Sequence, residues 1–297
     1  MSTLKIPIII IFCFSTLVLT LNAIIYQYPG NNYLYFNTIP VWIFAFFNFA
    51  LLLRMLGVHV ITKKIMQEYL LFFLVSAMIV FGANAIQYTP FTPIDAHILA
   101  WEKKLHLDSL SMVIWTNRHP KTNLYLNLMY NILEFEMIFC PIYALTLKKY
   151  HHLHEYFFLM LTTVYIGFIF YYFFPTTGPA SNLPASYFTQ NQLATGLKFS
   201  QIHHYQQPTT LLGGMIAMPS FHVIWAWLNV YLIRFKPLLC GLFVILNLFL
   251  TCACVLLGWH YVLDIVGSVL LLAMTFYIYK KSVPLHPEAL LSEKNIS

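Results

Sequence analysis

Charged side chains are scarce in this chain of 297 residues. Asp, Glu, Lys and Arg together make up 9% of the residues, whereas hydrophobic residues make up 60%. A soluble domain carries roughly 25% charged and about 45–50% apolar residues. This shortage of charge excludes a soluble globular enzyme, a disordered tail and a nucleic-acid-binding domain. The composition indicates a polytopic membrane protein, in which the positions of the few charges report orientation.

Cysteines are also few, and they form no recognisable pattern. All five lie in apolar stretches: Cys13, Cys140, Cys240, Cys252 and Cys254. Their spacing is not that of zinc ligands, and their density is not that of a disulfide scaffold. We therefore expect small buried hydrophobic side chains.

Long apolar runs are what the sequence has in abundance. A helix needs about 20 apolar residues to cross the hydrocarbon core of a bilayer. Runs of this length predict an all-α bundle with eight membrane-spanning helices, at about 6–26, 40–61, 68–88, 125–147, 156–174, 217–235, 238–257 and 259–280. The first run is too long for a typical signal peptide, so it is counted as a span.

These spans divide the chain into three parts. We expect a two-span hairpin over 1–66, a membrane-embedded domain over 67–281 and a cytoplasmic tail over 282–297. The membrane domain has two long outer loops, at 89–124 and 175–214. Within the first loop, residues 94–105 alternate apolar and charged positions with a helical period, which predicts an amphipathic helix in the membrane interface.

Basic residues concentrate on the side of the membrane that carries both termini. Ten lie on that side: Lys5, Lys63, Lys64, Lys148, Lys149, Arg234, Lys236, Lys280, Lys281 and Lys294. Five lie on the opposite side: Lys103, Lys104, Arg118, Lys121 and Lys198. By the positive-inside rule the termini are cytoplasmic and the long loops are extracytoplasmic.

Three short segments stand out at the outer face. Residues 174–179 close the fifth span, residues 218–222 open the sixth, and residues 258–264 open the eighth. His222 and His260 are 38 residues apart, and two membrane crossings take roughly 40 residues. The chain therefore crosses and returns between them, and we expect all three segments at the same face.

The residues of these segments suit phosphoryl chemistry. His260 and Asp264 are four apart, so on a helix the carboxylate can fix the imidazole tautomer and leave the other nitrogen as a nucleophile. Pro219 suits a first helical position, and the amides that follow, with the Ser220 hydroxyl, form a helix N-terminus suited to phosphate. His222 is placed to protonate a leaving oxygen.

Structural alternatives stand beside each of these roles. For Ser220 alone a plain helix start is the preferred interpretation. Two histidines and a carboxylate at one membrane surface favour function, because polar residues inside a membrane are costly. A metal site formed by His222, His260 and Asp264 is a further alternative, although no HExxH pattern or second carboxylate supports it.

The same residues resemble the motifs of a known family. Pro219-Ser220-Phe221-His222 resembles PSGH, and the stretch from His260 to Asp264 resembles the end of SR-x5-H-x3-D. Both motifs belong to the type 2 phosphatidic acid phosphatase superfamily of membrane lipid phosphatases and phosphotransferases. The resemblance covers roughly residues 89–280.

This resemblance implies a fold and a set of roles. It implies a six-helix core, a phosphohistidine on His260, orientation of that ring by Asp264, and His222 as the acid to the leaving group. Ser220 would hold phosphate oxygens. Neither a metal nor another cofactor is implied. The expected partner is a membrane lipid substrate, which is a phospholipid, an isoprenyl phosphate or a sphingolipid.

Two departures from the family pattern refine the expected substrate. Residues 175–179 stand where the family has K-x6-RP, and Cys254-Val255 stands near the Ser-Arg pair. The proline-rich segment looks more like the branch of inositol phosphorylceramide and sphingomyelin synthases, which transfers a phospho-headgroup between lipids. A phosphodiester carries one charge, so the loss of basic residues favours headgroup transfer over hydrolysis of a phosphomonoester. The outer loops offer four candidate substrate contacts: Thr176, Thr177, Lys198 and Arg118.

Three charged residues inside the predicted spans have no assigned role. Glu134 and Glu136 are two apart in the fourth span and cannot share a helix face. Arg54 lies in the second span. We expect a structural ion pair between Arg54 and one of the carboxylates, with a relay or substrate role as the alternative.

The sequence therefore predicts an integral membrane lipid phosphatase or phosphotransferase. A headgroup transferase of the synthase branch is the narrower alternative. A non-catalytic lipid-binding or transport protein on the same scaffold is an alternative of another class. An intramembrane serine protease using Ser220 and His260 is weaker, because Ser220 lies at a helix start without flanking glycines.

Overall fold

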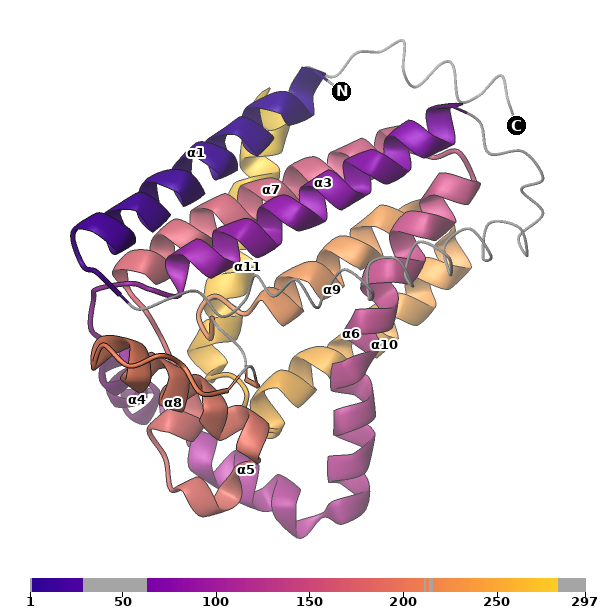
Figure 1. The fold of residues 1–297 in the computed structure, drawn as a ribbon. Helices are drawn as coiled ribbons and strands as arrows, with labels where there is room; N and C mark the ends of the chain where they lie inside the picture. Colours follow the sequence, from indigo (N-terminus) through magenta and orange to yellow (C-terminus); the bar gives the residue numbers. More distant parts are fainter. Residues whose placement is uncertain (1, 29–62, 211, 214–215, 283–297) are drawn as a thin grey trace.

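The computed structural model describes residues 2–28, 63–210, 212–213 and 216–282, and this part of the chain is all-helical, with ten α-helices and no strand (Figure 1). Six of the helices are long and apolar enough to cross a membrane: α1 (Ser2–Ile24), α3 (Lys63–Ile86), α6 (Pro120–Thr146), α7 (Tyr150–Phe173), α10 (Pro237–Leu256) and α11 (Val262–Ser282). The fold class is confirmed, and the chain is a multi-pass membrane protein.

The sixth expected span, at 217–235, is shorter in the structure than the sequence suggested. Helix α9 covers Phe221–Leu232 and continues as a single 3-10 turn, η4, over Ile233–Phe235. It begins late because Ser220 is its N-cap, with the Ser220 hydroxyl accepting from the Val223 amide at 3.5 Å. The expected span at 40–61, with Arg54, lies outside the described residues. The number eight therefore stays a prediction.

Helix α7 forms the centre of the bundle. It packs against α1, α3, α9 and α11, and α10 packs against α6 and α9. Side chains on all sides of α7, among them Tyr156, Phe157, Leu159 and Leu161, have no solvent exposure. A helix that is apolar all round is buried on all sides, which explains its central place.

Short helices cover the end of the bundle opposite the N-terminus of α1 (Figure 1). They are α4 (Asp95–Lys104), α5 (Ser109–Arg118) and α8 (Gln190–His203), with 3-10 turns η2 (Pro179–Ser181) and η3 (Ala185–Tyr187). Helix α4 confirms the helix expected over 94–105. The Asp108 side chain caps α5, and Thr189 forms a capping box with Gln192 at α8.

Ion pairs tie the helices at the other end. The buried Glu68 of α3 pairs with Lys64 and lies 2.6 Å from His154 Nε2 on α7. Glu155 of α7 pairs with Arg234 of η4. The basic residues Lys64 and Arg234 therefore lie at the end of the bundle opposite α4, α5 and α8.

The two carboxylates of α6 do face different ways. Glu134 is exposed, whereas Glu136 is fully buried and accepts from Asn247 Nδ2 at 3.1 and 3.0 Å. Asn247 lies on α10, so this contact joins two helices in the middle of the bundle. The expected pairing with Arg54 lies outside the described residues.

Candidate active site

The three segments singled out in the sequence meet at the end of the bundle covered by α4, α5 and α8. The Thr176 hydroxyl oxygen accepts from the Met218 amide at 2.7 Å, which joins the first segment to the second. The Ala217 carbonyl oxygen lies 2.8 Å from His260 Nδ1, which joins the second to the third. The count of residues per membrane crossing therefore predicted their meeting correctly.

A glycine starts the segment that carries His260. Gly258 has φ +79°, the left-handed conformation that ends α10. A Cβ there would lie 2.7 Å from atoms of Phe188 and Val113, so a side chain has no room. The Trp259 and His260 amides then donate back to the Cys254 carbonyl at 3.1 and 3.0 Å. This turn aims the His260 ring at the start of α9.

The contacts of His260 set its tautomer. A carbonyl oxygen can only accept, so the bond to Ala217 places the hydrogen on Nδ1 and leaves the lone pair on Nε2. Asp264 Oδ2 lies 3.4 Å from the same Nδ1, and at 2.9 Å it accepts from the Tyr261 amide. The expected orienting role is thus shared, because a backbone carbonyl makes the shorter contact.

Burial also controls the charge of His260. The residue is 4% exposed, and this burial lowers the pKa of His260 to about 4, although the bond to Ala217 acts in the opposite direction. At neutral pH the ring is therefore uncharged and its Nε2 lone pair is free to attack.

We expect this lowered pKa to appear in the pH dependence of the reaction. Protonation of His260 removes its lone pair, so activity persists as the pH falls through 6.5, the value of a free histidine, and is lost only near pH 4. The measurement is kcat/KM across the acid range, with return to pH 7 as a check for irreversible loss. An acid limb centred between pH 6 and 7 would contradict the assignment.

The start of α9 forms the wall opposite His260. Ser220 is fully buried, and its amide donates to the Ser268 hydroxyl of α11 at 2.8 Å. The Ser268 hydroxyl also lies 3.2 Å from the Ser220 carbonyl oxygen and 2.7 Å from the Asp264 carbonyl oxygen of its own helix, so Ser268 joins the start of α9 to α11. The first amides of any helix have no acceptor within the helix, so those of Phe221 and His222 suit an anion.

An aromatic stack holds the second histidine. The His222 ring stacks on Tyr130 with ring centroids 4.4 Å apart, and Tyr130 stacks in turn on Trp259 at 5.2 Å. The centroids of His222 and His260 are 6.0 Å apart. The two rings therefore lie next to each other. Tyr130 was missed from the sequence, because one tyrosine among 20 in a chain of this composition carries no signal.

Phe221 stands where the resembled motif has glycine, and a glycine on another helix makes room for it. The Phe221 ring packs edge-on against Phe168 of α7, with centroids 5.4 Å apart. A Cβ on the neighbouring Gly167 would lie 2.7 Å from Phe221 Cζ. The large side chain therefore points into the bundle, toward α7.

The first segment lacks the basic residues of the family motif, and a buried carboxylate holds its backbone. Asp95 of α4 is 1% exposed and accepts from the Thr177 and Gly178 amides at 2.9 Å each. Burial raises the pKa of Asp95, and these two amide bonds partly offset the rise. Gly178 has φ +84°, and a Cβ there would lie 3.2 Å from the Trp259 carbonyl oxygen. Asp95 thus pins the segment against the turn of His260.

A second buried carboxylate caps the helix of Asp264. Glu102 of α4 accepts from the Val262 and Leu263 amides at 2.6 and 3.3 Å, and from the Ser109 hydroxyl at 2.5 Å. A carboxylate is stabilising at a helix N-terminus. The start of α11 is therefore already satisfied, which leaves the start of α9 for a phosphate. The helix that carries Asp95 and Glu102 was predicted from the sequence, but no role was predicted for either carboxylate.

Replacing Asp95 by asparagine is expected to lower stability by about 1–3 kcal/mol, because one of the two amides loses its acceptor in a buried place. The measurement is thermal unfolding of the protein in detergent. Asp108→Asn is the matched control, because Asp108 is an exposed helix cap and asparagine caps equally well. Equal unfolding temperatures for both variants would contradict this role.

The four candidates in the outer loops have different places. Thr176 and Thr177 are buried and tie the segments together, as described above. Lys198 is 4% exposed, donates to the Gly213 carbonyl at 3.3 Å, and has its pKa lowered to about 8 by burial. Arg118 ends α5, is exposed, and takes part in none of the hydrogen bonds that hold His260 within the described ranges. The structure therefore does not bring Arg118 to the histidines.

Within the described residues, no group of three or more His, Cys, Asp and Glu side chains is arranged to hold a metal ion. His222, His260 and Asp264 lie close together, but His260 Nδ1 and Asp264 Oδ2 both face backbone partners.

Comparison with known proteins agrees with the geometry. A family model described as the PAP2 superfamily matches residues 96–278, which is more than half of the chain. The match begins in α4, ends in α11 and includes all three segments of the site. No curated protein and no solved structure matched. Membership of this superfamily implies phosphatase-type activity on phosphate-bearing substrates. The chain belongs to the PAP2 superfamily.

Proposed function

We propose that the protein is an integral membrane lipid phosphatase or phosphotransferase that works through a phosphohistidine on His260. The observation that carries the proposal is the hold on His260 Nδ1 by the Ala217 carbonyl at 2.8 Å, with the His222 ring 6.0 Å away. This arrangement places a second imidazole beside a neutral nucleophile.

The chemistry divides into two balanced steps. In the first, Nε2 of His260 attacks the phosphorus, a N–P bond forms, and the bond to the leaving oxygen breaks as the imidazolium form of His222, which the bound phosphate anion favours, gives that oxygen a proton. In the second, His222 takes a proton from water or a lipid hydroxyl. That oxygen attacks the phosphorus and the N–P bond breaks. Ser220 and the first amides of α9 hold the phosphoryl oxygens throughout.

The charges around the site favour a phosphodiester as donor. Three buried carboxylates accept hydrogen bonds from backbone amides of the site, and they belong to Asp95, Glu102 and Asp264. A phosphomonoester with two negative charges would be repelled by them more strongly than a diester with one. This balance supports the headgroup-transferase alternative of the inositol phosphorylceramide and sphingomyelin synthase type.

The substrate test uses the purified protein in nanodiscs with labelled donors. These are phosphatidic acid, isoprenyl pyrophosphate, and phosphatidylinositol with ceramide or diacylglycerol. Release of phosphate supports the phosphatase, and a new labelled lipid supports the transferase. No turnover of any donor would overturn the proposal in favour of a non-catalytic lipid-binding or transport protein.

We further propose cytoplasmic termini and an extracytoplasmic active site. Ile6 of α1 and Ser282 of α11 border one pocket, so the start of α1 and the end of α11 lie together, at the end of the bundle away from α4, α5 and α8 (Figure 1). Clusters of lysine and arginine favour the cytoplasmic side.

Labelling of single cysteines tests this orientation. Both probe positions are exposed: Arg118 at the active-site end and Lys281 at the other. A membrane-impermeant thiol reagent applied from outside is expected to label Arg118→Cys in intact cells and to label Lys281→Cys only after permeabilisation. The reverse pattern would contradict the orientation.

A further inference from the structure

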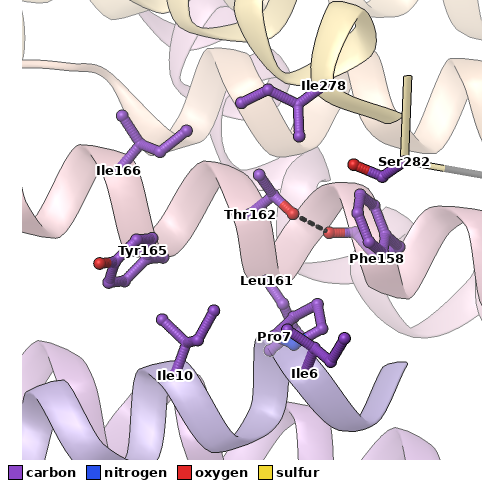
Figure 2. Close-up of a pocket in the computed structure, with 10 residues that line it drawn as sticks. All are labelled: Ile6, Pro7, Ile10, Phe158, Leu161, Thr162, Tyr165, Ile166, Ile278 and Ser282. Atoms are coloured by element: carbon purple, nitrogen blue, oxygen red, sulfur yellow. Dashed lines mark hydrogen bonds between the residues drawn. The ribbon is translucent and has the colours of Figure 1, made fainter. Parts of the chain in front are cut away.

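An apolar groove lies between α7 and α11 and begins beside Met218 and Pro219, the residues before Ser220. It consists of two cavities that share Ile166 of α7 as a wall. The cavity nearer the site measures about 270 Å³ and is bordered by Met218 and Pro219. The farther cavity measures about 410 Å³, and Figure 2 shows it lying between α7, α11 and the start of α1.

The groove begins directly behind the phosphate-binding end of α9. Its wall there is Pro219, the residue before Ser220. Two glycines keep this place open: a Cβ on Gly167 would lie 3.2 Å from Pro219 Cγ, and one on Gly267 would lie 3.1 Å from Met218 Cε. A molecule in this nearer cavity therefore touches the segment that positions Ser220 and His222.

The groove opens toward the lipid along α11. Leu270 is 65% exposed and Met274 is 43% exposed, and both border the cavity nearer the site. These residues belong to a membrane-spanning helix, so this opening faces hydrocarbon. A lipid can thus enter sideways from the bilayer.

The length of the groove matches one leaflet of a membrane. Gly267 and Ile278 border its two parts, and the helix rises about 1.5 Å per residue, so they are roughly 16 Å apart. The hydrocarbon core of a bilayer is about 30 Å thick, so one leaflet spans roughly half of that. A lipid whose headgroup lies at the outer surface would have its chain at this depth.

The lining also suits a hydrocarbon. The Thr162 hydroxyl is the polar side-chain group at the middle of the farther cavity, and it donates to the Phe158 carbonyl at 2.8 Å, as the dashed line in Figure 2 marks. Its hydrogen-bonding capacity is thereby used within its own helix. Ile6, Ile10, Ile166 and Ile278 supply apolar walls (Figure 2).

We propose that this groove binds one hydrocarbon chain of the lipid substrate while the phosphate lies between His222 and His260. The proposal rests on the proposed function for the identity of the headgroup end. It adds a binding site that lies outside the catalytic segments and that selects substrates by the length of their chains.

Photolabelling tests the groove without requiring turnover. The full chain is placed in phosphatidylcholine nanodiscs with phosphatidic acid or phosphatidylinositol that carries a diazirine near the end of one chain. Labelled residues are mapped by mass spectrometry. We expect either probe to label the helix faces that line the groove, with labelling reduced at least fivefold by an excess of the same unlabelled lipid. His260→Ala is expected to keep this labelling.

Two variants that fill the groove, and one control variant outside it, test the groove separately from the catalytic residues. Ile166→Trp fills the wall that both cavities share, and Ile278→Trp fills the farther cavity alone. The matched control is Ile138→Trp, because Ile138 is 55% exposed on α6 and borders neither cavity. We expect groove labelling to fall at least fivefold in a filled variant and to stay unchanged in the control. The preference for 18-carbon over 6-carbon chains in kcat/KM should fall about tenfold.

The groove proposal and the proposed function fail in different ways. Uniform labelling of all lipid-facing helices, or labelling that the filled variants leave unchanged, would overturn the groove. Crosslinks between residues 29–62 of this chain and Ile166→Cys would also overturn the groove proposal, because a segment of the protein itself would then occupy the groove. Absence of turnover with intact groove labelling would overturn only the enzymatic proposal.

Discussion

Replacing His260 by alanine is expected to lower turnover of the lipid substrate by at least about a thousandfold, because the attacking nitrogen is removed. The protein should still fold. The shortest contact of the His260 side chain is the one to the Ala217 carbonyl, and loss of one such bond costs roughly 1 kcal/mol. The measurement is kcat in nanodiscs, beside the unfolding temperature of the same preparation.

His97→Ala is the matched control for this loss. His97 lies on α4 near the site but is exposed, and alanine is favourable in a helix. We expect its turnover to stay within about twofold of the unchanged protein. If His260→Ala also keeps turnover within a few fold, the nucleophile has been assigned wrongly.

Replacing His222 by asparagine is expected to lower turnover by about 10²–10⁴-fold for a lipid donor, whose leaving oxygen needs a proton. The loss should shrink to about tenfold or less for an aryl phosphate or phosphodiester, whose leaving group departs without one. Comparing kcat/KM for the two donors therefore isolates proton transfer from binding. Equal losses for both donors would contradict the role of His222 as an acid.

Tyr130 offers a control for the placement of His222. Tyr130→Phe keeps the ring that stacks on His222 and Trp259 and removes only the hydroxyl, 3.5 Å from His222 Nδ1. We expect it to keep most activity, whereas Tyr130→Leu removes the stack and should lower kcat. Tyr130 is thus a positioning residue, and its variants should leave the dependence on the leaving group unchanged.

The meeting of the three segments could be predicted because it depends on one physical length. A helix crosses a bilayer in about 20 residues, so the 38 residues between His222 and His260 had to return the chain to the same face. The helix at Asp95–Lys104 could be predicted for a similar reason, from the period of its apolar residues. Both features follow from regular geometry.

The partners within the site could not be predicted, because they depend on loop conformation. His260 Nδ1 contacts the Ala217 carbonyl more closely than Asp264, and nothing in the spacing of His260 and Asp264 indicates that carbonyl. In the sequence, Asp95 and Glu102 indicate the polar face of an amphipathic helix in the membrane interface. The structure buries both and pairs them with amides that are far away in sequence.

Phe221 shows how a departure from a motif can be absorbed elsewhere. The sequence shows that a large ring replaces glycine before His222, but not where that ring goes. The room for it comes from Gly167 on α7, where a Cβ would lie 2.7 Å from the ring. Such compensation between helices is visible only once their packing is known.

If the phosphoryl group passes through His260, a covalent intermediate can be trapped on that residue. The protein is mixed with a donor labelled with ³²P at the phosphorus, quenched with alkali within a fraction of a second, and digested for mass spectrometry. We expect an acid-labile, alkali-stable phosphoryl group on the peptide that contains His260. It should be absent in His260→Ala and should accumulate in His222→Asn with an aryl donor. Rapid turnover without label on this peptide, or label on Ser220 instead, would contradict this expectation.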